Sequence, residues 1–233
     1  ILNYIEEEYV DSVSKSELVE KIIPDMLAEL DPHSIYIPAR DLKRTNEPLE
    51  GNFDGIGIQF NIQRDTVFVV NPIPKGPSEK VGILAGDRIV YVDDSLIAGT
   101  GITNNSVMKM LRGKQGTKVK LGIKRKQNKE VINFVVTRDK IPLYSVDVAY
   151  MVSEDIGYIK ISKFSRTTFD EFISAIEELQ SAGLKKLILD LRNNSGGYMN
   201  AAINIADQFL NSNKLIVYTQ GKARPKNKSF STS

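Results

Sequence analysis

The sequence predicts a multidomain α+β protein made of N-terminal helices, a compact β-rich module, and an incomplete α/β core of βαβ type. Three observations predict this class. Apolar residues recur at helical spacing over residues 1–30, five short strands separated by turn residues follow, and a strand, helix, strand and helix then succeed one another. We therefore expect a helical region and linker at 1–50, the β-rich module at 51–138 and the partial core at 139–233.

The composition is that of a globular protein and excludes several kinds of chemistry. The chain has 233 residues with 41% hydrophobic and 26% charged residues, a net charge of +2 and no Cys. Disulfides, cysteine-ligated metals and thiol nucleophiles are therefore excluded, and a single histidine excludes a His-rich metal site. We expect no metal and no cofactor. No apolar run approaches the ~20 residues of a membrane span, and a start at Ile1 without Met suggests a segment of a longer protein.

Basic residues cluster at Lys118–Lys129 and Lys214–Lys228. We expect a solvated hairpin at the first cluster and a loose polar tail at the second. Nucleic-acid binding is disfavoured, because these cations lack interleaved aromatic residues.

The first 50 residues are expected to be mainly helical. Two apolar series at helical spacing flank a turn near Asp11, with Ser14 or Ser16 as the cap of the second helix and Pro24 as a kink. These helices carry more apolar surface than a linker needs, so we expect them to pack on the core or to support a homodimer. His33 follows a proline and is interpreted as a turn histidine rather than a catalytic base. Residues 39–50 are expected to form a short helix and a linker.

Period-two alternation and turn residues define the β-rich module. The predicted strands are Ile56–Ile62, Thr66–Val70, Arg88–Val92, Lys118–Lys124 and Val131–Thr137, with turn signals that include Gln127–Asn128. The predicted helices are Ser78–Val81 and Asn105–Leu111.

The module resembles a PDZ domain. Gly55-Ile56-Gly57-Ile58 is similar to the carboxylate-binding loop of that family, and residues 77–93 are similar to its segment between a short helix and a central strand. Glycines let the backbone approach a peptide carboxylate, the following strand pairs with the peptide, and a helix forms the other wall. The resemblance implies a partner with a free, apolar C-terminus. It assigns substrate binding to Gly55, Ile56, Gly57, Ile58, Val107, Met108 and Leu111.

The last part alternates strands and helices, which implies a partly parallel sheet. Strands are predicted at Ser145–Met151, Ile156–Ile161, Leu184–Leu191 and Leu215–Thr219, and helices at 168–181 and 201–210. Thr167 or Thr168 is the expected cap of the first helix, with Glu171 completing a capping box with Thr168.

A turn of polar residues and two glycines, Asn193–Gly197, links a strand to a helix and should present backbone N–H groups to negative charge. This charge is either a bound anion or the oxyanion of acyl transfer. Ser195 is rejected as a nucleophile, because it lacks the Gly-x-Ser-x-Gly setting. For Asp190 and Arg192, a structural ion pair and a direct catalytic role remain equally open.

Five motifs in one order resemble the C-terminal processing proteases, which are tail-specific serine peptidases with an inserted PDZ domain. The motifs are Leu30-Asp31-Pro32-His33-Ser34, Phe53-Asp54-Gly55-Ile56-Gly57-Ile58, Leu111-Arg112-Gly113-Lys114-Gln115-Gly116-Thr117, Ile156-Gly157-Tyr158-Ile159 with Phe164, and Leu189-Asp190-Leu191-Arg192-Asn193-Asn194-Ser195-Gly196-Gly197.

The resemblance implies a serine endopeptidase with a Ser–Lys dyad, and backbone oxyanion donors at Gly196 and Gly197. It also implies a periplasmic or cell-envelope location. Ser229, Ser231 and Ser233 lack the family's serine context, so we expect the dyad beyond this chain and the chain itself to be inactive. The alternative is a non-catalytic PDZ-type peptide-binding or scaffold protein.

Overall fold

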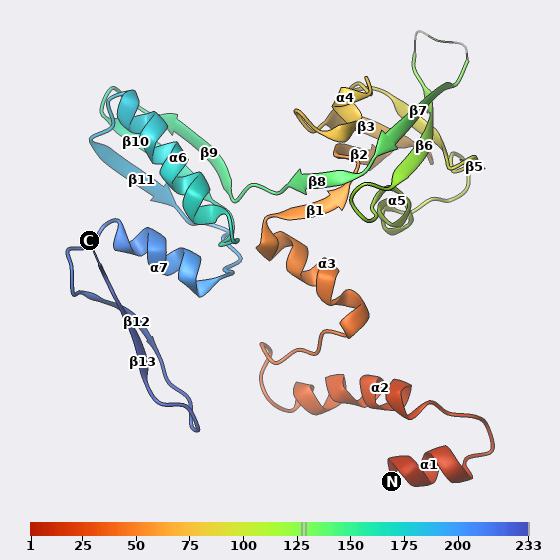
Figure 1. Cartoon of the computed structure of the whole chain (residues 1–233), viewed down its shortest axis with the longest axis horizontal. Coiled ribbons are helices and arrows are strands. Elements are labelled where there is room, and N and C mark those ends of the chain that lie inside the picture. Colours follow the sequence, from red (N-terminus) through yellow and green to blue (C-terminus); the bar gives the residue numbers. More distant parts are fainter. Residues whose placement is uncertain (127, 129, 233) are drawn as a thin grey trace. The chain divides into compact units, whose positions relative to one another are not determined.

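The computed structural model describes residues 1–126, 128 and 130–232 (Figure 1). It contains two compact units, Ile1–Glu47 and Pro48–Ser233. Part of the turn expected at Gln127–Asn128 lies outside the described residues, as does Ser233. The division into three domains stays a prediction.

The first unit contains α1 (Leu2–Glu8), α2 (Lys15–Ala28) and most of α3 (Ala39–Glu50). Ser14 caps α2, because its Oγ accepts a hydrogen bond from the Glu17 N–H at 3.4 Å, which selects one of the two predicted caps. None of the three helices contains a buried residue. Their packing against a partner stays a prediction.

His33 lies in an exposed turn after α2, as the sequence predicts. The Asp31 carboxylate accepts hydrogen bonds from the His33 backbone N–H at 2.8 Å and from the Ser34 hydroxyl at 2.9 Å. These bonds, led by the one from the His33 N–H, hold the pKa of Asp31 below its usual value. The His33 side chain is 96% exposed, so it has the surroundings of a turn residue.

The β-rich module is an antiparallel sheet in the order β2-β3-β4-β6-β7. The strands are β2 (Ile58–Ile62), β3 (Val67–Pro72), β4 (Arg88–Val92), β6 (Lys118–Lys124) and β7 (Ile132–Thr137), and β5 (Ser95–Leu96) pairs with β4. Alternate strand positions such as Val69, Ile89 and Leu121 are fully buried and form the core with α5 (Asn104–Leu111). The short α4 (Pro77–Lys80) is also where the sequence predicts a helix.

Two short strands that the sequence does not reveal join the ends of this module. β1 (Asn52–Gly55) runs antiparallel to β8 (Asp139–Pro142), with Phe53 opposite Ile141 (Figure 1). Each is only four residues long, and each is stabilised by a partner far away in the sequence. Local pattern therefore carries little signal for either strand.

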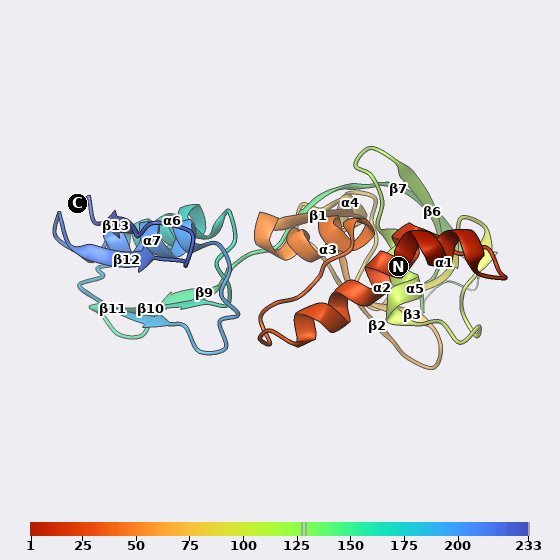
Figure 2. The same cartoon turned by 90° about the horizontal axis from the view of Figure 1, so that it is seen from below.

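The last part of the chain has the predicted βαβ arrangement. Its sheet has the order β11-β10-β9, from β9 (Val146–Met151), β10 (Ile156–Ile161) and β11 (Lys186–Asp190), with β10 and β11 parallel. The helices α6 (Thr168–Ser181) and α7 (Met199–Asp207) lie on the same side of this sheet (Figure 2). Their buried residues Phe172 and Ile205 pack against Ile159 and Ile161 of β10.

The predicted capping box of α6 is wrong. Thr167, not Thr168, is the N-cap, and the Thr168 hydroxyl instead accepts a hydrogen bond from the Ser165 N–H at 2.6 Å. Glu171 contacts the helix terminus in another way, because its Oε1 accepts the hydroxyl hydrogen of the N-cap Thr167 at 2.7 Å. Its Oε2 accepts the backbone N–H groups of Ser145 at 2.6 Å and Val146 at 3.0 Å. Glu171 therefore combines a local contact at the N-cap with a tertiary contact that ties α6 to the start of β9.

The loose basic tail is also a wrong prediction. β12 (Leu215–Thr219) pairs antiparallel with β13 (Asn227–Phe230), so the segment is a hairpin. Ser231 is 3% exposed, and its hydroxyl accepts from the Lys214 N–H at 2.8 Å and donates to the Asn211 carbonyl at 2.6 Å. β13 was not predicted from the sequence, because Asn227, Lys228 and Ser229 leave it without an alternation of apolar and polar residues.

Candidate functional site

The predicted Gly-Gly turn lies between β11 and α7, and its backbone conformation requires glycine at one position. Gly196 and Gly197 have φ values of +81° and +141°. A Cβ on Gly197 would lie 2.1 Å from the carbonyl oxygen of Phe164, whereas a Cβ on Gly196 would meet nothing within 4 Å. Close approach to Phe164 therefore fixes the residue type at Gly197.

Phe164 holds the turn through two backbone hydrogen bonds. Its N–H donates to the Gly196 carbonyl at 2.8 Å, and its carbonyl accepts the Tyr198 N–H at 2.7 Å. This is a parallel bridge between Phe164 and Gly197, in which the N–H and carbonyl of Gly197 point away from Phe164. Within the described part of the chain, no acceptor is recorded for the Gly197 N–H.

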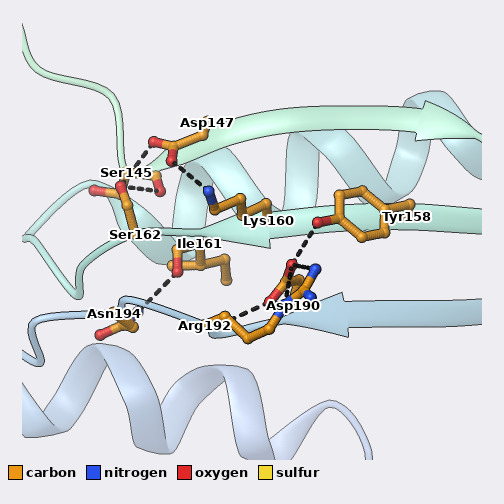
Figure 3. Close-up of polar contacts among 9 residues, drawn as sticks. All are labelled: Ser145, Asp147, Tyr158, Lys160, Ile161, Ser162, Asp190, Arg192 and Asn194. Carbon is orange, nitrogen blue, oxygen red and sulfur yellow. Dashed lines mark hydrogen bonds and ion pairs between the residues drawn. The ribbon is translucent and has the colours of Figure 1, made fainter.

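Asn194 braces the turn from within and was not singled out by sequence reasoning. Its Nδ2 donates to the Ile161 carbonyl at 2.9 Å, at the end of β10 (Figure 3). Its Oδ1 accepts the Gly196 N–H at 2.7 Å. The Gly196 N–H is thus already paired. Of the two predicted oxyanion donors, only Gly197 has its N–H available in this conformation, and the catalytic role of both stays a prediction.

Asp190 and Arg192 form the structural ion pair that was one of the two interpretations from the sequence. The Arg192 guanidinium contacts Asp190 Oδ2 at 2.7 Å, and the Arg192 backbone N–H donates to Asp190 Oδ1 at 2.8 Å. Tyr158 on β10 donates its hydroxyl hydrogen to the same carboxylate at 2.5 Å (Figure 3). The Asp190 side chain is 6% exposed, so this carboxylate ties the end of β11 to β10.

These contacts set the charge state of the cluster. The hydrogen bonds from Arg192 and then from Tyr158 hold the pKa of Asp190 far below its usual value. The same carboxylate raises the pKa of Tyr158, so the phenol stays protonated at neutral pH. A group with such settled protonation suits anchoring rather than proton transfer.

A second polar cluster beside the turn brings a serine and a lysine together. Ser162 donates to Asp147 Oδ1 at 2.7 Å, and Lys160 Nζ lies 3.9 Å from Asp147 Oδ2 (Figure 3). In a Ser–Lys dyad the serine hydroxyl donates to the lysine amine, whereas the Ser162 hydroxyl donates to the Asp147 carboxylate. The recorded contacts of this cluster are therefore not those of a Ser–Lys dyad. Ser195 is exposed in the turn, where its N–H donates to the Ser162 carbonyl at 3.1 Å.

The predicted carboxylate loop precedes β2 and is firmly held. Gly57 has a φ of +70°, and β2 begins at the next residue, Ile58. The buried Ser78 donates both its hydroxyl, at 2.7 Å, and its N–H, at 3.0 Å, to the Ile56 carbonyl. β2 is an edge strand of its sheet, so an extended peptide has an open edge on which to pair.

The three apolar candidates on α5 differ in exposure. Val107 is 0% exposed and Leu111 is 4% exposed, so both pack in the core of the module rather than offering surface to a peptide. These two side chains face the sheet, and their role in substrate binding stays a prediction. Met108 is half-buried and remains the available candidate.

Two absences hold for the described residues. They contain no group of three or more His, Cys, Asp or Glu side chains placed to hold a metal ion. None of their helices is long and apolar enough to cross a membrane.

Comparisons with known proteins give two family matches. The PDZ domain matches residues 55–136, and Peptidase family S41 matches residues 155–233. The carboxy-terminal processing protease CtpB of Bacillus subtilis strain 168 is 32% identical over 231 residues, which are 98% of this chain and 48% of that protein. A carboxy-terminal-processing protease of Bartonella bacilliformis is 36% identical over 226 residues, with coverages of 95% and 51%.

The solved structure of a photosystem II D1 C-terminal processing protease aligns with a TM-score of 0.42 at 23% identity. The alignment covers 100% of this chain and 69% of the chain in that solved structure. The chain spans about half the length of the curated relatives named above.

Proposed function

We propose that this chain, which matches Peptidase family S41 over residues 155–233 and the PDZ domain over residues 55–136, serves a C-terminal processing protease, a serine endopeptidase that acts on C-terminal tails. In this proposal the PDZ-like module captures the substrate's free C-terminus. The Gly-Gly turn supplies an oxyanion donor to a Ser–Lys dyad.

The observation that carries the proposal is the geometry of the Gly-Gly turn. The N–H of Gly197 points away from Phe164 on a turn held from both sides, and no acceptor is recorded for it among the described residues. A donor held in advance of the reaction costs no reorganisation when negative charge develops on a carbonyl oxygen. The anchored Asp190 and Asn194 keep the turn in this conformation.

Tail capture is supported by a loop and an edge strand. Gly57 places its backbone beside the start of β2, and a Cβ there would lie 3.0 Å from Ile141 and 3.3 Å from Pro77. Backbone N–H groups in such a loop can receive a terminal carboxylate, while β2 pairs with the residues before it. Micromolar capture corresponds to roughly 8 kcal/mol, which selects tails without trapping product.

Three further expectations belong to the same proposal. The chain by itself is inactive, since the hydroxyls of Ser162 and Ser231 are engaged and Ser195 has no lysine partner recorded among the described residues. The helices of residues 1–30 support a homodimer. The protein works in the periplasm or cell envelope, as the family resemblance implies.

Capture is tested by fluorescence anisotropy with a labelled peptide that ends in apolar residues, with its C-terminus either free or amidated. We expect the free carboxylate to bind about tenfold more tightly. Gly57→Ala should remove this preference, because it adds a side chain in the carboxylate loop.

Gly116→Ala is the matched control, since Gly116 has a similar φ of +85° but open space around it. Equal binding of the two peptides, or equal loss of preference in the two variants, would contradict tail capture. Cleavage of the peptide by the chain alone, blocked by a serine-directed inhibitor, would contradict the expected inactivity.

A further inference from the structure

A concave site of the β-rich module is lined by residues of β3, β4 and β6 and of the segments that flank β4 and β6. It is a cavity of about 740 Å³. Its lining residues are Phe68, Leu84, Ala85, Gly86, Asp87, Arg88, Lys124, Arg125, Lys126 and Asn128. None of these comes from β2, α5 or the loop Gly55–Ile58, so the site is separate from the proposed tail-binding groove.

The strand register places like charges side by side in this cavity. Arg88 on β4 is the direct cross-strand partner of Lys124 on β6, and Phe68 on β3 is the partner of Arg88 on the other side. Both cations are exposed, and like charges directly opposite each other destabilise an antiparallel pair. The arrangement costs stability that a bound anion would restore.

The acidic residue in the cavity is already neutralised. Asp87 is 1% exposed and is bound by Arg125 through two hydrogen bonds of 2.7 Å and 2.8 Å, and it also accepts the Leu84 N–H at 2.9 Å. For Arg88, Lys124 and Lys126, no ion pair is recorded with any described residue. The cavity therefore keeps an excess of positive charge.

Apolar surface lies beside these cations. Leu84 is 51% exposed and Phe68 is half-buried at the cavity wall. A ligand that fills this site must combine negative charge with an apolar group. Inorganic phosphate lacks the apolar group, a flat membrane surface does not follow a hollow, and a nucleic acid strand needs a longer basic track with several aromatic platforms.

We propose that this cavity, defined by Phe68, Leu84, Arg88, Lys124 and Lys126, binds an acidic peptide segment that carries an apolar residue between its carboxylates. Carboxylates of the segment pair with the unpartnered cations, and its apolar side chain covers Leu84 and Phe68. The segment is read along its length rather than at its C-terminus. The site is independent of the proposed proteolytic function.

The test uses the full chain and a labelled peptide, Glu-Glu-Leu-Glu-Glu, acetylated and C-terminally amidated so that it cannot use a carboxylate loop. We expect saturable binding by fluorescence anisotropy. Binding should weaken as salt rises from about 0.05 M to about 0.5 M, because exposed ion pairs are screened. Replacing the leucine by serine should also weaken binding.

Lys124→Glu gives a signature that a merely structural role would not produce. It should abolish peptide binding and at the same time raise the thermal midpoint of the chain by about 2–4 °C, since it replaces a like-charge pair with an ion pair to Arg88. Lys118→Gln is the matched control, because Lys118 is an exposed lysine at the other end of β6 and is absent from the cavity. The milder double variant Arg88→Gln with Lys124→Gln should weaken binding about tenfold, or ~1.4 kcal/mol.

The proposal fails if the peptide does not bind, if Lys118→Gln weakens binding as much as Lys124→Glu, or if the leucine-to-serine peptide binds equally well. It also fails if anionic lipid vesicles, inorganic phosphate or a single-stranded oligonucleotide displace the peptide and bind more tightly than it does. A folded double variant with unchanged affinity would overturn it as well.

Discussion

Substitution of Gly197 by alanine tests whether the turn acts by aiming one backbone N–H. The new Cβ would lie 2.1 Å from the Phe164 oxygen and 2.7 Å from its carbonyl carbon, and ordinary contact begins at 3.4 Å. The turn and Phe164 must therefore separate by about 1 Å. That movement breaks the hydrogen bonds that Phe164 makes with the Gly196 carbonyl and the Tyr198 N–H.

The expected loss follows from this displacement. Misplacement by about 1 Å costs roughly 10²-fold in rate, and loss of one oxyanion donor costs roughly 10²–10³-fold, or ~3–4 kcal/mol. We therefore expect kcat/KM for a tail peptide to fall by about 10²–10³-fold in a catalytically competent protein that carries this chain. The fall should appear mainly in kcat, because the tail-binding loop is untouched.

Gly196→Ala is the control within the same turn. Its φ of +81° is unfavourable for alanine, at about 1–2 kcal/mol, but its Cβ meets no atom within 4 Å and its N–H is retained. Urea unfolding of both variants separates stability from rate. If Gly197→Ala kept kcat/KM within about threefold of Gly196→Ala, the turn would not supply a critical donor, and this account of the site would be refuted.

Three other substitutions probe the scaffold. Phe172→Ala, at a side chain 1% exposed in the core beside α7, should lower the unfolding free energy by about 3–5 kcal/mol, measured by urea denaturation; a loss below about 1 kcal/mol would contradict the assigned core. Ser78→Ala removes one of two hydrogen bonds to the Ile56 carbonyl and should cost about 1 kcal/mol and weaken tail binding, with Ser95→Ala at an exposed serine of β5 as the control. The folded pKa of Asp190 lies below its unfolded value of ~3.9, so its contribution to stability is present above that pH and is lost as the pH falls further. Arg192→Gln should make stability depend less on pH below about 4, and an unchanged pH profile by chemical denaturation would exclude this ion pair as the cause.

Local pattern predicted the elements that local forces determine. β4 and β6 have the predicted bounds, because β4 is a short apolar run, β6 alternates apolar and polar residues, and turn residues flank both. β1 and β8 were missed, since four residues carry no period and each strand is stabilised by its distant partner. β13 was missed because lysine and asparagine occupy positions that pair with β12. In these strands, tertiary pairing overrides weak propensity.

The candidate site shows the same boundary between local and distant information. The position of the Gly197 turn could be predicted, because polar residues and two glycines after an apolar run indicate a turn between a strand and a helix. Its supports could not be predicted. Tyr158 reaches Asp190 across 32 residues of sequence, and Asn194 reaches Ile161 across 33. Only the parallel register of β10 and β11 brings these partners together.

The sequence motif could not show that the two adjacent glycines differ in the availability of their backbone N–H groups. Both were predicted as oxyanion donors, yet the Asn194 side chain takes the Gly196 N–H and leaves the Gly197 N–H available. In the proposed oxyanion site, we therefore expect Gly196 to shape the turn and Gly197 to supply its N–H. An oxyanion has more than one lone pair, so a single N–H donor satisfies only part of its hydrogen-bonding capacity. An oxyanion site built on the Gly197 N–H therefore needs a second donor. The Asn194 side chain could release the Gly196 N–H only by giving up that hydrogen bond, so in the braced conformation the second donor must come from a residue other than Gly196.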